Sequence, residues 1–208
     1  MQGQYGAALK QLEGAKTSGA SPADVENLKG LATMLAGNPQ AALAEFDRAL
    51  ALSPTLFEAR FNRAIALLKL EQFAKASAEL EKIYADEHAP LRASAAYHNG
   101  IALDRLGRSE EAEQWLQRAL TLDPSLDSAL LYVGAIRERR GDLQAAGRAY
   151  LDYLKTHADD PFAMLRFGIS AQRAGKPDTA KKYLQRVLDV APESREALEA
   201  RKYLVMWE

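Results

Sequence analysis

The side chains that most often carry out chemistry are few and widely separated in this sequence. The three histidines, His88, His98 and His157, fall in an expected loop, a first helix and the end of a second helix. None has a histidine four residues away, which is the spacing at which a helix presents two zinc ligands. Solvated or structurally paired imidazoles account for all three, so we predict no metal site.

Motifs for nucleophilic or phosphate chemistry are also missing from the sequence. There is no cysteine, and the serines of GRSEE and GISAQ lack the closing glycine of a G-x-S-x-G turn. No glycine-rich phosphate loop is present. The acidic pairs Glu110–Glu111 and Asp159–Asp160 fall at expected helix starts, where carboxylates stabilise the helix dipole. We therefore predict no enzyme activity and no cofactor.

Charge and hydropathy exclude further classes of function. The formal net charge is −1, with 48% apolar and 26% charged residues. The basic segment RERRG, residues 137–141, is explained as the last turn of a helix, so we expect no nucleic-acid partner. No apolar run is long enough to span a bilayer, which predicts no direct membrane insertion in this segment.

Localisation is left open by the sequence. Residues 1–16 lack the apolar core of a signal sequence, so the chain as given is expected in the cytoplasm. A periplasmic or envelope-associated place stays open if the chain is a fragment without its signal. The alanine-rich, cysteine-free composition favours a bacterial source.

A regular spacing of glycines organises the chain. The intervals between them are 34, 70, 34 and 34 residues, and Glu71 stands near the middle of the double interval; the glycines are Gly3, Gly37, Gly107, Gly141 and Gly175. Each lies in a short break between two segments of helical periodicity, where a left-handed residue ends a helix. A period of this length is typical of stacked repeats.

Two further columns keep the same period. Alanine follows each break by five residues, and a small residue precedes most breaks by seven: Gly30, Ala64, Gly100, Gly134 and Gly168. Small side chains let two helices approach closely, so these columns mark where the helices of a hairpin cross. Proline closes several units, as at Pro54, Pro124 and Pro192. Each unit is predicted to be helix, tight turn, helix, tight turn.

These columns resemble the tetratricopeptide repeat family. The fourth unit carries the family pattern most fully, with Gly100, Leu103, Leu106, Gly107, Ala112, Leu116, Ala119, Leu122 and Pro124. Arg60 and Arg63 in unit three, and Glu26 and Lys29 in unit two, replace apolar residues of the pattern, so their first helices are expected to pack less tightly.

The resemblance implies an all-α fold, a right-handed superhelical solenoid of about 12 helices in antiparallel pairs. We expect a single array, 1–208, whose units are a half repeat at 1–22, five repeats at 23–56, 57–92, 93–126, 127–160 and 161–194, and a terminal helix at 195–208.

The two ends of the array are expected to be incomplete. Residues 3–16 match a second helix without a first, and residues 193–208 match a first helix without a second. The last helix carries apolar residues including Leu198, Val205 and Trp207, whereas terminal repeats normally present polar surfaces. Two interpretations stand. In the first, the apolar ends are exposed because the chain is a segment of a longer array or stacks on itself. In the second, the last helix folds back and buries these residues.

The resemblance also implies where a ligand lies, because the family binds extended or helical peptides in a concave groove lined by first helices. The predicted peptide-binding residues are Phe61, Asn62, Ile65, Tyr97, His98, Ile101, Leu131, Tyr132, Leu165, Arg166 and Ile169. Whether the apolar members are exposed or belong to the core stays open. A basic column, Lys69, Arg105, Arg139 and Arg173, is explained by helix dipoles or forms a cationic rail for an acidic partner.

One subclass of the family grips the C-terminal carboxylates of chaperones with a clamp of lysine, asparagine and arginine. Here Leu31, Phe61 and Ser94 stand where asparagine or lysine is expected, which disfavours that partner. The leading hypothesis is a non-catalytic scaffold that binds a protein, as a peptide or amphipathic helix, in the groove. The alternatives are an assembly module that forms homo-oligomers through its terminal helices, and the adaptor portion of a larger multidomain protein.

Overall fold

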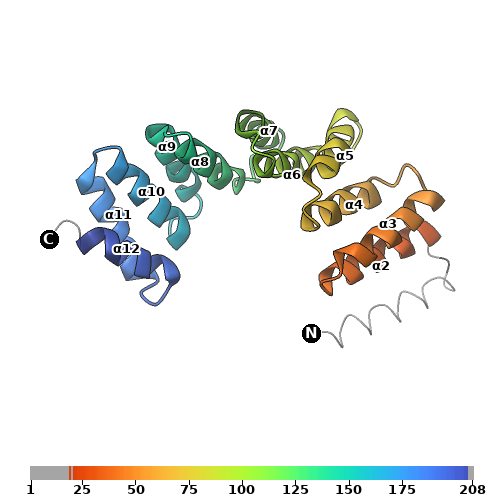
Figure 1. The fold of residues 1–208 in the computed structure, drawn as a ribbon, viewed down its shortest axis with the longest axis horizontal. Helices are drawn as coiled ribbons and strands as arrows, with labels where there is room; N and C mark the ends of the chain where they lie inside the picture. The colour runs from red at the N-terminus through yellow and green to blue at the C-terminus, as the bar shows by residue number, and fades with distance from the viewer. Residues whose placement is uncertain (1–18, 20, 206–208) are drawn as a thin grey trace. The chain divides into compact units, whose positions relative to one another are not determined.

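The computed structural model describes Gly19 and residues 21–205, and within them the chain is all-helical (Figure 1). Eleven helices occupy these residues: α2 Pro22–Leu35, α3 Pro39–Leu52, α4 Phe57–Lys69, α5 Phe73–Ala85, α6 Arg92–Arg105, α7 Ser109–Leu122, α8 Ala129–Arg139, α9 Leu143–Leu154, α10 Pro161–Arg173, α11 Pro177–Val190 and α12 Arg195–Val205. The helix expected at residues 3–16 lies outside the described residues.

The helices form two compact units. The first, up to Asp123, contains α2 to α7, and the second, from Pro124, contains α8 to α12. Within each unit every even-numbered helix, here called an A helix, packs against the odd-numbered B helix that follows it, except for α12. A helices also contact the next A helix in the same unit, as α2 contacts α4 and α10 contacts α12. The fold is therefore the expected solenoid of helix pairs, and the prediction of one continuous array stays a prediction.

The breaks between helices have the predicted left-handed residues. Backbone φ is +88° at Gly37, +77° at Gly107, +82° at Gly141 and +73° at Gly175. After α6 the amide of Gly107 donates to the Asp104 carbonyl at 3.0 Å, which satisfies a carbonyl at the helix end. Glu71 takes φ +58° at the corresponding place in its repeat and is the one described non-glycine residue with positive φ. The turn geometry, rather than the residue type, is thus what repeats.

The column of small residues marks close helix crossings. A Cβ added at Gly30 would lie 2.6 Å from Cδ1 of Phe46, and one at Gly134 would lie 2.6 Å from Cε1 of Tyr150. Both rings are fully buried. At these points an A helix lies directly against the largest side chain of its B helix, which confirms the crossing predicted from sequence.

The polar departures in the first two described repeats are paired across helices. Arg63 on α4 donates to Asp47 on α3 and to Glu79 on α5, each at 2.8 Å. Glu26, which is buried on α2, accepts a hydrogen bond from Arg48 Nε on α3 at 3.2 Å. Ion pairs therefore join helices where the family pattern has apolar contacts, and the expectation of looser packing stays untested.

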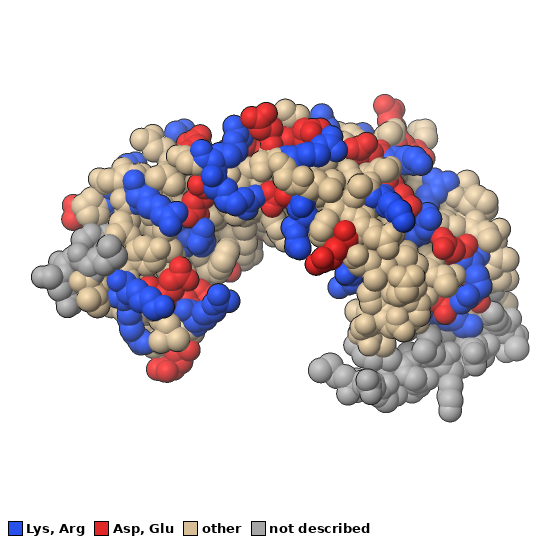
Figure 2. Space-filling model, in the orientation of Figure 1, with Lys and Arg blue, Asp and Glu red and all other residues tan. Residues whose placement is uncertain are grey.

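The acidic residues expected at helix starts lie there, and one of them caps its helix. The Asp160 carboxylate accepts a hydrogen bond from the Ala163 amide at 2.8 Å at the start of α10. Glu111, in the first turn of α7, instead forms an ion pair with Arg108 at 2.6 Å. Charges of both signs are intermixed over the face shown in Figure 2, in keeping with the net charge of −1.

Candidate functional site

A cluster of three rings lies on the A helices of the first unit. The His98 ring meets Phe61 edge to face, with centroids 5.4 Å apart, and meets Tyr97 in the same way at 5.0 Å. All three residues are half-buried. His98 Nδ1 lies 2.8 Å from the Ser94 carbonyl oxygen, and this bond fixes the orientation of the imidazole. The cluster presents aromatic edges in a preset arrangement.

The environment of His98 favours its neutral form. Burial lowers the pKa of His98 below its ordinary value, and the hydrogen bond to Ser94 opposes part of that effect. The imidazole is therefore uncharged at neutral pH, and it contributes a neutral aromatic ring to the surface rather than a cation. The assignment of His98 to a peptide groove stays a prediction, and the Ser94 carbonyl and the Phe61 and Tyr97 rings hold its imidazole in place.

A hydrogen-bonded amide pair lies beside the ring cluster. Asn62 Nδ2 on α4 donates to Asn27 Oδ1 on α2 at 2.9 Å. Asn27 is buried and Asn62 is half-buried, so Asn62 is the member that reaches the surface. Its second N–H and its carbonyl oxygen make no other hydrogen bond within the described residues. Asn62 can thus still pair with a peptide backbone.

The apolar residues of the predicted groove divide between surface and core. Phe61, Ile65, Ile101 and Leu131 are half-buried, as is Tyr97. Leu165 and Ile169 are only 3% and 1% exposed and belong to the core of the second unit. These two residues therefore have no surface for a ligand, and their assignment to the groove is corrected to the core. The apolar groove residues are therefore half-buried in three successive repeats and buried in the repeat that contains α10.

Two exposed aromatics lie on the A helices of the second unit. Tyr132 on α8, one of the predicted groove residues, is 36% exposed. Phe162, in the first turn of α10, is 45% exposed and was missed by the sequence analysis. Its signal is an aromatic residue directly after Pro161, at the place where earlier repeats have polar or small residues. Exposed rings of this kind are common in protein interfaces.

A buried carboxylate organises the arginines of the second unit. Glu138 Oε2 accepts from Arg166 Nη2 at 2.6 Å, and Oε1 accepts from Arg173 Nη1 at 3.1 Å. The Tyr150 hydroxyl donates to Oε2 at 3.2 Å. The Glu138 side chain is 4% exposed, against 30% for Arg166 and 52% for Arg173. One buried negative charge thus holds two guanidinium groups that reach solvent, leaving a local excess of one positive charge.

The predicted basic column is largely engaged within the chain. Arg105 lies 3.7 Å from Glu71 and also stacks over Phe73, with its Cζ 4.9 Å from the ring centroid. Arg173 binds Glu138, while Lys69 and Arg139 are exposed. The cationic rail stays a prediction, and Arg105 and Arg173 already have acidic partners.

The last described helix has one packed face and one exposed face. Ala197 and Ala200 are fully buried against α10 and α11, with Tyr203 and Leu204 half-buried beside them. Leu198 and Val205 are 57% and 64% exposed. The helix buries part of its apolar surface and exposes the rest, so both interpretations of this end stay predictions, and Trp207 lies outside the described residues.

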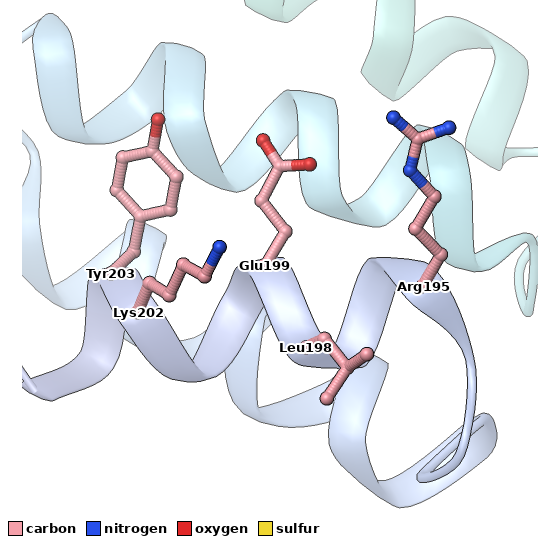
Figure 3. A pocket seen from close by; sticks show the side chains of 5 residues that line it. All are labelled: Arg195, Leu198, Glu199, Lys202 and Tyr203. Atoms are coloured by element: carbon pink, nitrogen blue, oxygen red, sulfur yellow. The ribbon is translucent and has the colours of Figure 1, made fainter.

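A hollow of roughly 570 Å³ adjoins α12 (Figure 3). Arg195, Glu199 and Tyr203 point to one side of the helix, and Leu198 points away from them. The lining mixes both charge signs with an aromatic ring. The hollow therefore offers charged and aromatic surface for contact.

Potential metal ligands and the remaining histidines are found elsewhere in the described residues. No cluster of three potential metal ligands is present among them. His157 stacks on Tyr153 with centroids 4.3 Å apart and lies 3.3 Å from Asp127, so a structural role accounts for it. No described helix has the length and apolar character needed to cross a membrane.

Comparison with known families agrees with this architecture. Models of the tetratricopeptide repeat match residues 2–56, 61–127 and 162–194. The chain belongs to the tetratricopeptide repeat family, whose members bind protein partners.

Solved structures of the same fold are close in shape and distant in sequence. PilW, described as a widely conserved type IV pilus biogenesis factor, has a TM-score of 0.83 at 23% identity, covering 94% of this chain and 90% of PilW. YrrB, described as a TPR protein with an unusual peptide-binding site, has a TM-score of 0.69 at 21% identity, covering 92% and 97%. These likenesses establish the fold.

A curated relative matches only part of the chain. A TPR repeat-containing protein of Dictyostelium discoideum is 28% identical over 106 residues, which cover 48% of this chain and 40% of the relative. The matched segment therefore spans less than half of that protein, and the relative supports the repeat type alone.

Proposed function

We propose that this protein is a non-catalytic interaction scaffold that binds a peptide or an amphipathic helix on its A-helix faces. The observation that carries the proposal is the ring cluster of Phe61, Tyr97 and His98. These half-buried rings are held by one another and by the Ser94 carbonyl before any partner arrives. Rigid aromatic groups give large contact area at low entropic cost.

Polar groups on the A helices of each unit supply specificity. Asn62 has hydrogen-bonding capacity left for a peptide backbone, and Arg166 reaches solvent from its bond to Glu138. Because Arg166 and Arg173 together outweigh the single Glu138 charge, the second unit favours an acidic group on the ligand. Tyr132 and Phe162 add exposed apolar area on the same set of helices.

The structural relatives are consistent with this function. The description of YrrB assigns it a peptide-binding site, and that of PilW assigns it to pilus biogenesis. At this level of identity neither role transfers by itself. The proposal rests on the A-helix residues of this chain, and the relatives supply the precedent of a fold with a peptide ligand.

Site-directed photo-crosslinking tests where a partner binds. Benzoylphenylalanine is placed at Tyr97 and, separately, at Tyr132, and cross-linked partners are identified by mass spectrometry and mapped to a peptide segment. Matched control positions are Leu52 and Leu122, which are 57% and 43% exposed on the B helices α3 and α7. Cross-links at the A-helix positions alone support the proposal. Equal or greater cross-linking from the B-helix positions contradicts it.

A second candidate function, self-assembly, is favoured by the exposed apolar face of α12. Leu198 and Val205 lie seven residues apart, on one face of the helix, and both are more than half exposed. Light scattering on the wild type and on a Leu198→Lys/Val205→Lys variant tests it. A dimer that dissociates in the variant supports assembly through α12, whereas a concentration-independent monomer rules it out.

A further inference from the structure

A hollow of roughly 390 Å³ lies between the B helices α9 and α11, with α10 beneath it. It is separate from the A-helix residues discussed above and lies entirely within the second unit. Its apolar walls include Leu143, Gly147, Leu151, Phe167, Ala171 and Ala174.

One glycine leaves part of the space in this hollow. Gly147 is in the middle of α9, off the period of the glycine columns, and has no side chain to fill the space between the two B helices. A Cβ there would meet only the Phe167 ring, at 3.5 Å, which is an ordinary contact. Phe167 is held in place by Tyr183, with ring centroids 4.6 Å apart, so the floor of the hollow is firm.

The charged groups at this hollow have one sign. Arg148 and Lys176 line it, both are exposed, and neither forms an ion pair within the described residues. No aspartate or glutamate lines the hollow. By contrast, the hollow beside α12 includes Glu199 and one between α3 and α5 includes Glu79.

A polar group also lies in the wall. Ser170 lines the hollow from α10, is fully buried, and its hydroxyl has no hydrogen-bond partner in the described part of the chain. The corresponding residues of the earlier repeats are Ala32, Ala66, Ala102 and Ile136. A buried hydroxyl without a hydrogen-bond partner is energetically unfavourable unless a bound group supplies that hydrogen bond.

We propose that this hollow is a second binding site, which takes a large apolar side chain with an adjacent carboxylate from a partner polypeptide. The apolar side chain packs on Phe167 and Leu151 in the space that Gly147 leaves. The carboxylate pairs with Arg148 and Lys176, whose charges are otherwise uncompensated locally. The site adds to the A-helix site and does not depend on it.

Three small probes separate the two parts of this recognition. N-acetylphenylalanine has the ring and the carboxylate, N-acetylphenylalaninamide has the ring alone, and N-acetylglycine has the carboxylate alone. Each is titrated into the full chain to about 20 mM, because fragment-sized ligands bind in the millimolar range. Amide ¹H–¹⁵N shifts of Gly147, Ala171 and Ala174 report on the hollow. We expect saturable shifts there with N-acetylphenylalanine, at an affinity at least fivefold above either other probe.

Two variants test the assignment. Gly147→Leu fills the hollow and is expected to abolish the shifts, with circular dichroism confirming that the helices persist. Arg148→Gln/Lys176→Gln is expected to weaken N-acetylphenylalanine at least fivefold and N-acetylphenylalaninamide less than twofold. The matched control Lys155→Gln/Lys181→Gln removes the same charge from exposed residues outside the hollow and should leave the affinity unchanged.

Three outcomes would overturn the proposal. The first is the absence of saturable shifts at these amides in the wild type. The second is equal affinity for N-acetylphenylalanine and its amide, which would remove the carboxylate from the recognition. The third is an unchanged affinity in Gly147→Leu, which would place the probe elsewhere on the chain.

Discussion

The Arg166 guanidinium on α10 donates to the buried Glu138 carboxylate on α8, with Nη2 2.6 Å from Oε2. This bond joins two successive A helices and orients the arginine that the proposed peptide site uses. Arg173 and Tyr150 bind the same carboxylate. The charge of the site and the packing of the repeat therefore depend on a single acidic residue.

Removing that carboxylate should destabilise the second unit. Glu138→Ala leaves Arg166 and the Tyr150 hydroxyl without their partner, at a cost of about 2 to 3 kcal/mol; this is below the range for fully buried pairs because the guanidinium groups reach solvent. Urea unfolding followed by circular dichroism measures it. Glu193→Ala, at an exposed loop position, should change the unfolding free energy by less than about 0.5 kcal/mol. Equal effects of the two substitutions on the unfolding free energy would contradict the structural role of Glu138.

Alkaline pH should weaken the fold through Tyr150. Burial raises the pKa of Tyr150 to about 12, from 10.0 for an exposed tyrosine. Because the folded state favours the protonated phenol, this stabilisation is fully present below pH 10 and is lost as pH rises from 10 to about 12. Between about pH 9 and pH 12 the wild type should lose about 2 kcal/mol more unfolding free energy than Tyr150→Phe. Urea titrations of both proteins across this range measure the difference, and parallel pH profiles would contradict it.

Two helical glycines should respond oppositely to the same substitution. Gly30→Ala forces a methyl group against the buried Phe46 ring and should cost about 2 kcal/mol. Gly147→Ala meets Phe167 at an ordinary 3.5 Å and should stabilise the protein by about 0.5 to 1 kcal/mol, since alanine is the better helix former. Thermal and urea unfolding of both variants check the signs. A gain at Gly30, or a large loss at Gly147, would show that the crossing geometry is wrong.

The left-handed turn at Glu71 should be improved by glycine. Glu71→Gly relieves a backbone conformation that side chains disfavour, at φ +58°, and should raise the unfolding free energy by about 1 kcal/mol. The ion pair it removes, to Arg105 at 3.7 Å, is exposed and weak. The control Glu81→Gly, in the exposed interior of α5, should cost about 1 kcal/mol. Destabilisation by both changes would argue against strain at Glu71.

The fold was predictable because its determinants are local and periodic. Gly107 and Gly141 occupy the same position in successive repeats, and each ends a helix there. The same spacing identified Glu71 as a turn residue despite its side chain. Gly30 and Gly134 sit opposite large B-helix side chains for the same reason. Turns and helix crossings of this kind can be predicted from the repeat period and the stereochemistry of a single residue.

The site was less predictable because exposure depends on neighbours distant in sequence. Leu165 and Leu131 hold the same place in successive repeats, yet one is 3% exposed and the other is half-buried. The pairing of Glu138 with Arg173, 35 residues later, follows no motif. Gly147 looks like an ordinary small residue until Phe167 is seen beside it.

Affinity for a mapped partner segment tests the central claim most directly. Once cross-linking has identified that segment, isothermal titration compares the wild type with Tyr97→Ala/Tyr132→Ala and with the B-helix control Leu52→Ala/Leu122→Ala. The A-helix variant should bind at least about tenfold more weakly, as expected for aromatic anchors of an interface, and the control should match the wild type. An A-helix variant that is folded and binds with unchanged affinity, or a control that loses binding instead, would contradict the account.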